Sequence, residues 1–104
     1  MKLVRDFIPI IIEKAGGTCE WRYTKSDAEY ISRLADKINE ETLELVEAET
    51  LEEAVEEAGD LYEVFKTLIE HKGVSLEDAR AAARVKRVKR GGFKSGIVLE
   101  SSSS

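Results

Sequence analysis

The spacing of apolar residues between Leu51 and Ile69 restricts the fold more than any other feature of this sequence. Apolar side chains recur there every three or four residues, at Leu51, Ala54, Val55, Ala58, Leu61, Tyr62, Phe65, Leu68 and Ile69. This is the period of an α-helix with one apolar face. A capping box at Thr50–Glu53 opens the helix, and Gly73 is suited to end it.

A second long helix is predicted immediately before the first. Ser26–Glu29 forms another capping box. Apolar residues then recur at helical spacing to about Ala48, at Ile31, Leu34, Ile38 and Leu45. Because the two helices are separated by a short connection, we expect them to form an antiparallel pair.

Two shorter helices are predicted on either side of this pair. Pro9 suits the first turn of a helix that runs to about Lys14, with Asp6 as its cap. A third cap at Ser75–Asp78 opens a helix that becomes basic and stops at Gly91.

Two further segments are predicted to be extended. Residues 18–23 alternate, with Cys19, Trp21 and Tyr23 on one side, which indicates a half-buried strand. Residues 93–99 are a candidate partner for it. We therefore expect an all-α helical bundle around a central antiparallel pair, completed by oligomerisation, with minor extended segments at the ends.

The chain length and composition favour one cytoplasmic domain. Its 104 residues fit a single domain, placed at 1–99, before a serine tail at 100–104 that is expected to be disordered. No stretch reaches the roughly 18 apolar residues that span a bilayer. The early Asp6 argues against a signal peptide. A single cysteine, Cys19, cannot form an internal disulfide, so a reducing compartment is the simplest interpretation.

Charge is distributed unevenly along the chain, whose net charge is −5. Glu40 to Asp60 contains ten acids and no bases, whereas Ala79 to Lys94 contains seven bases and no acids. Each block alone is typical of a solvated helix face. Together, the acidic and basic blocks indicate a cation-binding site and a phosphate-binding site. Nucleic-acid binding is not expected, because the acidic remainder of the chain would repel a polyanion.

The acids include two short motifs on the two long helices. One carries Glu41 and Glu44, and the other carries Glu57 and Asp60, each pair three residues apart and thus on one helix face. An antiparallel pair can bring all four together. Four carboxylates repel one another unless a cation lies among them, and oxygen ligands suit Mg²⁺ or Mn²⁺. The alternative is an ordinary solvated face. Lys37 either contacts a phosphate or pairs with Glu41.

The order EExxE, twelve intervening residues and ExxD resembles the signature of the MazG-type all-α NTP pyrophosphatases. Here it reads Glu40-Glu41-x-x-Glu44 and Glu57-x-x-Asp60. Residues 2–9 and 90–93 resemble the ends of a small branch described as phosphoribosyl-ATP pyrophosphohydrolase-like. Phe7 departs from this branch, which usually has a basic residue at that position.

The resemblance implies an Mg²⁺-dependent homodimer or homotetramer, with Mn²⁺ as a possible substitute. It implies hydrolysis of a nucleoside triphosphate between the α and β phosphates to the monophosphate and pyrophosphate, for example in nucleotide-pool house-cleaning. It also implies that Glu41, Glu44, Glu57 and Asp60 bind the metal. Glu40 and Glu41 become the catalytic candidates, with Glu40 placed to orient or deprotonate water although it points to a different face.

Basic and aromatic residues complete the expected site. Arginine suits bidentate phosphate contacts and lysine offers a point charge. The candidate phosphate ligands are Lys2, Arg5, Lys37, Arg87 and Arg90. Trp21 is the candidate for stacking on a base, with core packing as the alternative. Three rival functions remain: phosphoribosyl-ATP hydrolysis in histidine biosynthesis, a non-catalytic helical interaction module, and nucleic-acid binding through residues 79–94.

Overall fold

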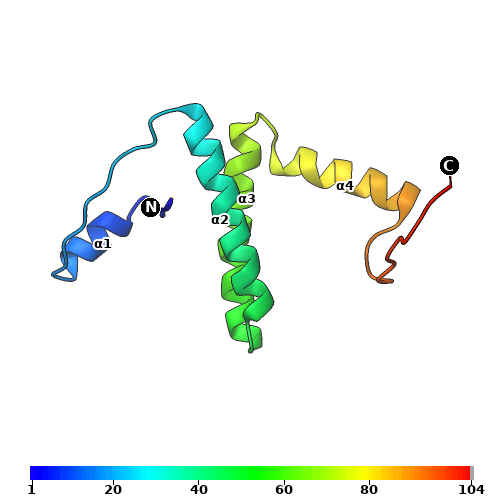
Figure 1. The fold of residues 1–104 in the computed structure, drawn as a ribbon, viewed down its shortest axis with the longest axis horizontal. Helices are drawn as coiled ribbons and strands as arrows, with labels where there is room; N and C mark the ends of the chain where they lie inside the picture. Colours follow the sequence, from blue (N-terminus) through cyan, green and yellow to red (C-terminus); the bar gives the residue numbers. More distant parts are fainter. Residues whose placement is uncertain (104) are drawn as a thin grey trace.

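The computed structural model describes residues 1–103, and these contain α-helices but no strand. The helices are α1 (Ile8–Lys14), α2 (Asp27–Glu47), α3 (Leu51–His71) and α4 (Leu76–Arg90). α2 and α3 lie side by side as an antiparallel hairpin, while α1 and α4 extend to opposite sides of it (Figure 1). The predicted all-α fold is therefore confirmed. No helix in this part of the chain has the length and hydrophobicity needed to cross a membrane.

The N-cap hydrogen bonds form at all three predicted caps, but only one of the capping boxes is complete. The hydroxyls of Ser26 and Thr50 accept hydrogen bonds from the backbone N–H groups of Glu29 and Glu53 at 3.0 and 3.1 Å. The Ser75–Asp78 box is complete in both directions. These bonds satisfy donors that the first turn of a helix leaves without partners. The starts of α2, α3 and α4 were therefore predictable from the local sequence.

The start of α1 differs from the prediction. Its N-cap is Phe7 rather than Asp6, and the Phe7 side chain makes no capping hydrogen bond. Instead, the backbone N–H of Ile8 donates to the carbonyl of Arg5 at 3.1 Å. The helix begins one residue before Pro9, which moves the cap past Asp6 and leaves that carboxylate outside the first turn.

The predicted strand at residues 18–23 was wrong. Within the described residues neither this segment nor residues 93–99 forms a strand. A strand needs a neighbour for its backbone hydrogen bonds, and the C-terminal segment follows α4 away from the linker that precedes α2 (Figure 1). The aromatic rings of that linker do not enter a core either: Trp21 and Tyr23 are 56% and 81% exposed and contact each other edge to face, with centroids 5.1 Å apart.

A single chain has a very small hydrophobic core. Leu34 is the one fully buried apolar side chain among residues 1–103. The accessible surface is 9108 Å², whereas a compact monomer of this mass exposes roughly 5800 Å². α3 carries an outer apolar face of exposed side chains, made of Leu51, Val55, Tyr62 and Phe65, and Leu43 and Val46 of α2 are also exposed. α4 does not cover this face within one chain, because it projects away from the hairpin (Figure 1).

Glu29 ties the linker to the start of α2. Its carboxylate accepts hydrogen bonds from the guanidinium groups of Arg22 at 2.7 Å and Arg33 at 3.1 Å, and from the backbone N–H of Lys25 at 2.7 Å. The bond from Arg22, followed by that from the Lys25 backbone, holds the pKa of Glu29 well below its ordinary value of 4.5. The ionised form is therefore specifically stabilised in the folded chain.

This lowered pKa predicts acid sensitivity. A depressed folded-state pKa contributes stability that is present above the unfolded value of about 4.5 and is lost as the pH falls towards the folded value. We expect the melting temperature of the wild type to fall more steeply below pH 5 than that of Glu29→Gln, and the variant to be less stable at pH 7. Thermal melts between pH 3 and 7 test this, and parallel curves would contradict it.

Candidate metal and phosphate site

The antiparallel hairpin brings three of the predicted acids together. Glu41 and Glu44 of α2 and Glu57 of α3 each offer a carboxylate oxygen, and these three oxygens lie within 4.8 Å of one another. Glu41 is buried, Glu57 is half-buried and Glu44 is exposed. The cluster therefore spans the seam between the two helices and opens to solvent on one side.

The deep side of this cluster lacks ordinary partners. The Oε2 atoms of Glu41 and Glu57 are buried without a hydrogen-bond partner in residues 1–103. Leaving a buried polar atom unpaired costs about 1–3 kcal/mol. Burial raises the pKa of the Glu41 carboxyl, Glu44 and Asp60 raise it further, and Lys37 acts in the opposite direction. An oxygen-binding divalent cation fits such a set, since it would supply the missing partner and offset the repulsion.

Asp60 lies next to this cluster but has a different partner. Its Oδ1 accepts a hydrogen bond from the Arg5 guanidinium at 2.8 Å. Asp60 also lines the same cavity as Glu41, and its charge is close enough to act on the Glu41 carboxyl. The fourth predicted metal ligand is thus adjacent to the other three, with an arginine bound to it.

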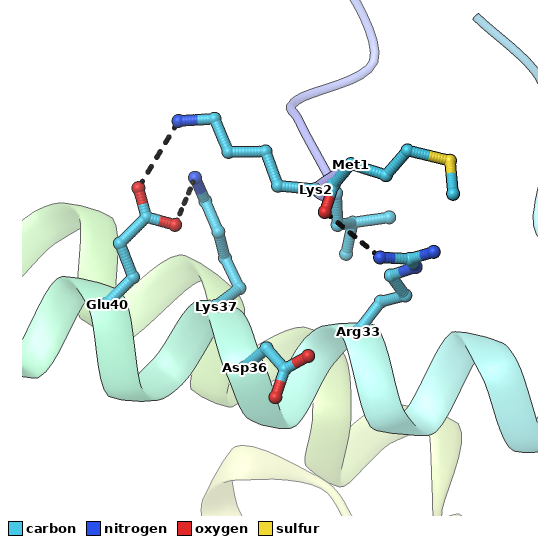
Figure 2. Close-up of a pocket in the computed structure, with 7 residues that line it drawn as sticks. Met1, Lys2, Arg33, Asp36, Lys37 and Glu40 are labelled. Atoms are coloured by element: carbon cyan, nitrogen blue, oxygen red, sulfur yellow. Dashed lines mark hydrogen bonds and ion pairs between the residues drawn. The ribbon is translucent and has the colours of Figure 1, made fainter.

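The carboxylate of Glu40, next to Glu41 in sequence, forms ion pairs with two lysines. The Nζ of Lys37 lies 3.3 Å from Glu40, and the Nζ of Lys2 lies 3.4 Å from Glu40 (Figure 2). The Nζ of Lys37 also lies 3.5 Å from Glu41. Burial acts to raise the pKa of Glu40, but the bonds from Lys37 and Lys2 outweigh it, so that the pKa is lowered. The Lys37–Glu41 ion pair considered from the sequence is present, and Glu40 is stabilised as a carboxylate.

The structure separates the predicted basic residues into two groups. Lys2, Arg5 and Lys37 contact the acids directly. Arg87 and Arg90 lie near the far end of α4, which is directed away from the hairpin (Figure 1). Trp21, the predicted stacking residue, lies in the exposed linker before α2 and is not part of the cavity beside the acids.

That cavity lies between the N-terminal segment with α1 and the hairpin, and its volume is about 460 Å³. This is within the usual range for small-molecule sites. Its lining combines apolar and charged side chains. The apolar ones include Val4, Ile8, Ile11, Tyr30, Leu34 and Val64, and the charged ones include Arg5, Lys37, Glu41 and Asp60.

Sequence reasoning missed several residues of this region. Tyr30, Val64 and Thr67 line the cavity. The aromatic ring of Tyr30 suits either base stacking or core packing, but no sequence pattern placed Val64 or Thr67 at the site. Arg33 donates to the carbonyl of Met1 at 3.0 Å. The only sequence feature that indicates a contact for Arg33 is its position four residues after Glu29, with which it forms an ion pair.

Comparison with known families agrees with this geometry. The family model described as phosphoribosyl-ATP pyrophosphohydrolase matches residues 4–87, which include α1, the hairpin and most of α4. The chain belongs to this family. The family is part of the MazG-like all-α NTP pyrophosphatase superfamily, so the suspected relationship is confirmed. No curated protein and no solved structure matches the chain.

Membership in the phosphoribosyl-ATP pyrophosphohydrolase family supports one class of reaction, the hydrolysis of a phosphoanhydride bond. It implies a nucleotide substrate. A group of three glutamates in the hairpin is compatible with the divalent metal that is typical of the superfamily.

Proposed function

We propose that this protein hydrolyses a nucleoside triphosphate between its α and β phosphates, with Mg²⁺ held by Glu41, Glu44, Glu57 and Asp60. The observation that carries the proposal is the set of buried, unpartnered carboxylate oxygens on Glu41 and Glu57. A solvated helix face would leave its carboxylates in water. These two oxygens are instead buried without a partner, and Glu41 also lies beside Lys37 and lines a cavity of about 460 Å³.

The acids and the basic residues of the site would have different roles. When bound, Mg²⁺ would neutralise phosphate oxygens and help to acidify the attacking water. Lys2, Arg5 and Lys37 lie close enough to the acids to offset charge on the leaving pyrophosphate. The apolar side chains that line the cavity would hold the nucleoside.

The covalent change is a simple hydrolysis. The oxygen of water joins one phosphorus of the α–β bridge, and the bond from that phosphorus to the bridging oxygen breaks. The products are the nucleoside monophosphate and pyrophosphate. Glu40, ionised and beside the cluster, is the candidate for orienting the water or accepting its proton.

The proposal includes a homo-oligomer in the cytoplasm. The outer apolar face is exposed to solvent in a single chain, and contact with a second copy of the chain would bury it. Arg87 and Arg90 lie away from the acids of their own chain (Figure 1). We therefore place any phosphate contact from these two arginines in the site of a partner copy.

Phosphoribosyl-ATP is the second candidate substrate, because the description of the matched family names its hydrolysis. The bond that breaks is the same in both cases, so the cluster serves either. The two candidates differ in the group attached to the adenine ring, which the cavity would have to accommodate beside the nucleoside.

Pyrophosphate release tests the function. Purified protein is assayed against canonical and modified nucleoside triphosphates and phosphoribosyl-ATP, with and without Mg²⁺. We expect Mg²⁺-dependent release that falls at least about 10-fold in Glu44→Gln and stays within about twofold in Glu47→Gln, which alters an exposed acid outside the cluster. No release from any substrate would favour the helical interaction module, and equal losses in both variants would remove the assigned role of Glu44.

A further inference from the structure

The first six residues form an N-terminal strap (residues 1–6) that crosses the acidic side of the hairpin. The Lys2 ammonium lies 3.4 Å from Glu40 and the Arg5 guanidinium lies 2.8 Å from Asp60. The carbonyl of Met1 accepts a hydrogen bond from Arg33 (Figure 2). Side-chain and backbone contacts thus hold the strap on α2 and α3, far from it in sequence.

Arg5 occupies an oxygen that the proposed site requires. Asp60 Oδ1 accepts the Arg5 hydrogen bond, and Asp60 is the acid that lies outside the close group of three glutamates. In the absence of a metal ion, the guanidinium of Arg5 offsets the negative charge of Asp60. The two side chains are 58% and 41% exposed, and an ion pair of this kind is weak enough to exchange.

Arg5 also has a second suitable partner in the same cavity. Both Arg5 and Asp60 line the cavity that would receive the substrate. The planar fork of arginine fits the oxygens of a phosphate as well as those of a carboxylate. The guanidinium therefore has two alternative acceptors, one present in the chain and one brought by the substrate.

We propose that Arg5 holds the place of the metal ion at Asp60 and that metal binding releases it to bind the triphosphate. The strap would then change its partner from a carboxylate to a phosphate, so that Arg5 becomes a phosphate ligand only after the metal is bound. This inference rests on the proposed function, because it assumes a metal at Asp60.

Limited trypsin digestion reports the state of Arg5 without measuring hydrolysis. Trypsin must bind the free arginine side chain, so cleavage after Arg5 is expected to be slow in metal-free protein and severalfold faster with Mn²⁺. A triphosphate with an α,β-imido bridge, which is not hydrolysed, should slow it again. Cleavage after Lys94, an exposed residue beyond α4, serves as the internal reference. An unchanged ratio of the two cleavages with Mn²⁺ would overturn the proposal.

Metal affinity provides the second readout. Titration calorimetry with Mn²⁺ alone is expected to show about two- to fivefold tighter binding in Arg5→Gln, since the competing ion pair is gone. Lys2→Gln is the matched control, because it removes the same charge from the strap but from Glu40 rather than Asp60. Equal affinity gains in both variants, or none in Arg5→Gln, would overturn the proposal. Wild-type protein that binds no Mn²⁺ would instead remove the proposed function itself.

Discussion

Glu41→Gln is expected to lose Mg²⁺-dependent pyrophosphate release by about 10³-fold, the scale of losing several kcal/mol of charge stabilisation. The variant keeps the shape of the side chain but replaces the most buried carboxylate of the cluster. A neutral amide binds a divalent cation far more weakly than a carboxylate does. Pyrophosphate release at saturating Mg²⁺ measures the loss, and activity close to that of the wild type would exclude Glu41 as a metal ligand.

The same variant is expected to be more stable than the wild type when no metal is present. Burial and the neighbouring Glu44 and Asp60 oppose the charge on Glu41, and together they outweigh the ion pair with Lys37. Removing the charge should therefore add about 1 kcal/mol, which raises the melting temperature of a domain of this size by roughly 4–8 °C.

Melting curves with and without Mg²⁺ separate this effect from simple damage to the fold. Bound ligand at 100 times its dissociation constant stabilises a protein by about 2.7 kcal/mol. Mg²⁺ should give this gain in the wild type and in the surface control Glu47→Gln, but hardly any in Glu41→Gln. A Glu41→Gln protein that melts below the wild type without metal would contradict the electrostatic interpretation.

Tyr62→Asp is expected to weaken self-association by roughly 100-fold or more, because a carboxylate buried in an apolar contact is costly. Tyr62 and Val55 lie seven residues apart on one stripe of α3 and are 49% and 63% exposed. Residues two positions apart point in nearly opposite directions on a helix, so Asp60 faces away from this stripe. The substitution therefore tests the outer apolar face without touching the acids.

Sedimentation velocity over a range of concentrations measures the change, with Tyr62→Phe as the matched control that keeps the ring. The wild type and Tyr62→Phe should associate, while Tyr62→Asp should be a monomer of lower melting temperature. The exposed area of 9108 Å² exceeds that of a compact monomer by roughly 3000 Å², which is ample for an obligate interface. A wild type that remains monomeric at every concentration would contradict the proposed oligomer.

The sequence by itself determined the helices and the main acids of the candidate site. Ser26, Thr50 and Ser75 marked the starts of α2, α3 and α4 because capping bonds join residues only three positions apart. Helical periodicity placed Glu41 and Glu57 on either side of the seam because α2 and α3 are regular and joined by a short connection. These features depend on contacts between residues close together in the chain, so they can be predicted from the sequence.

Only the tertiary structure decided what surrounds those acids. The contacts of Lys2 with Glu40 and of Arg5 with Asp60 join residues 38 and 55 positions apart, and no local pattern encodes such a pairing. The strand predicted at residues 18–23 failed for the same reason: alternation shows that a segment is able to pair, but the path of the chain decides whether a partner is within reach. The unpartnered oxygens and the cavity depend on how the strap, α1 and the hairpin come together, because burial is a property of neighbours rather than of sequence position.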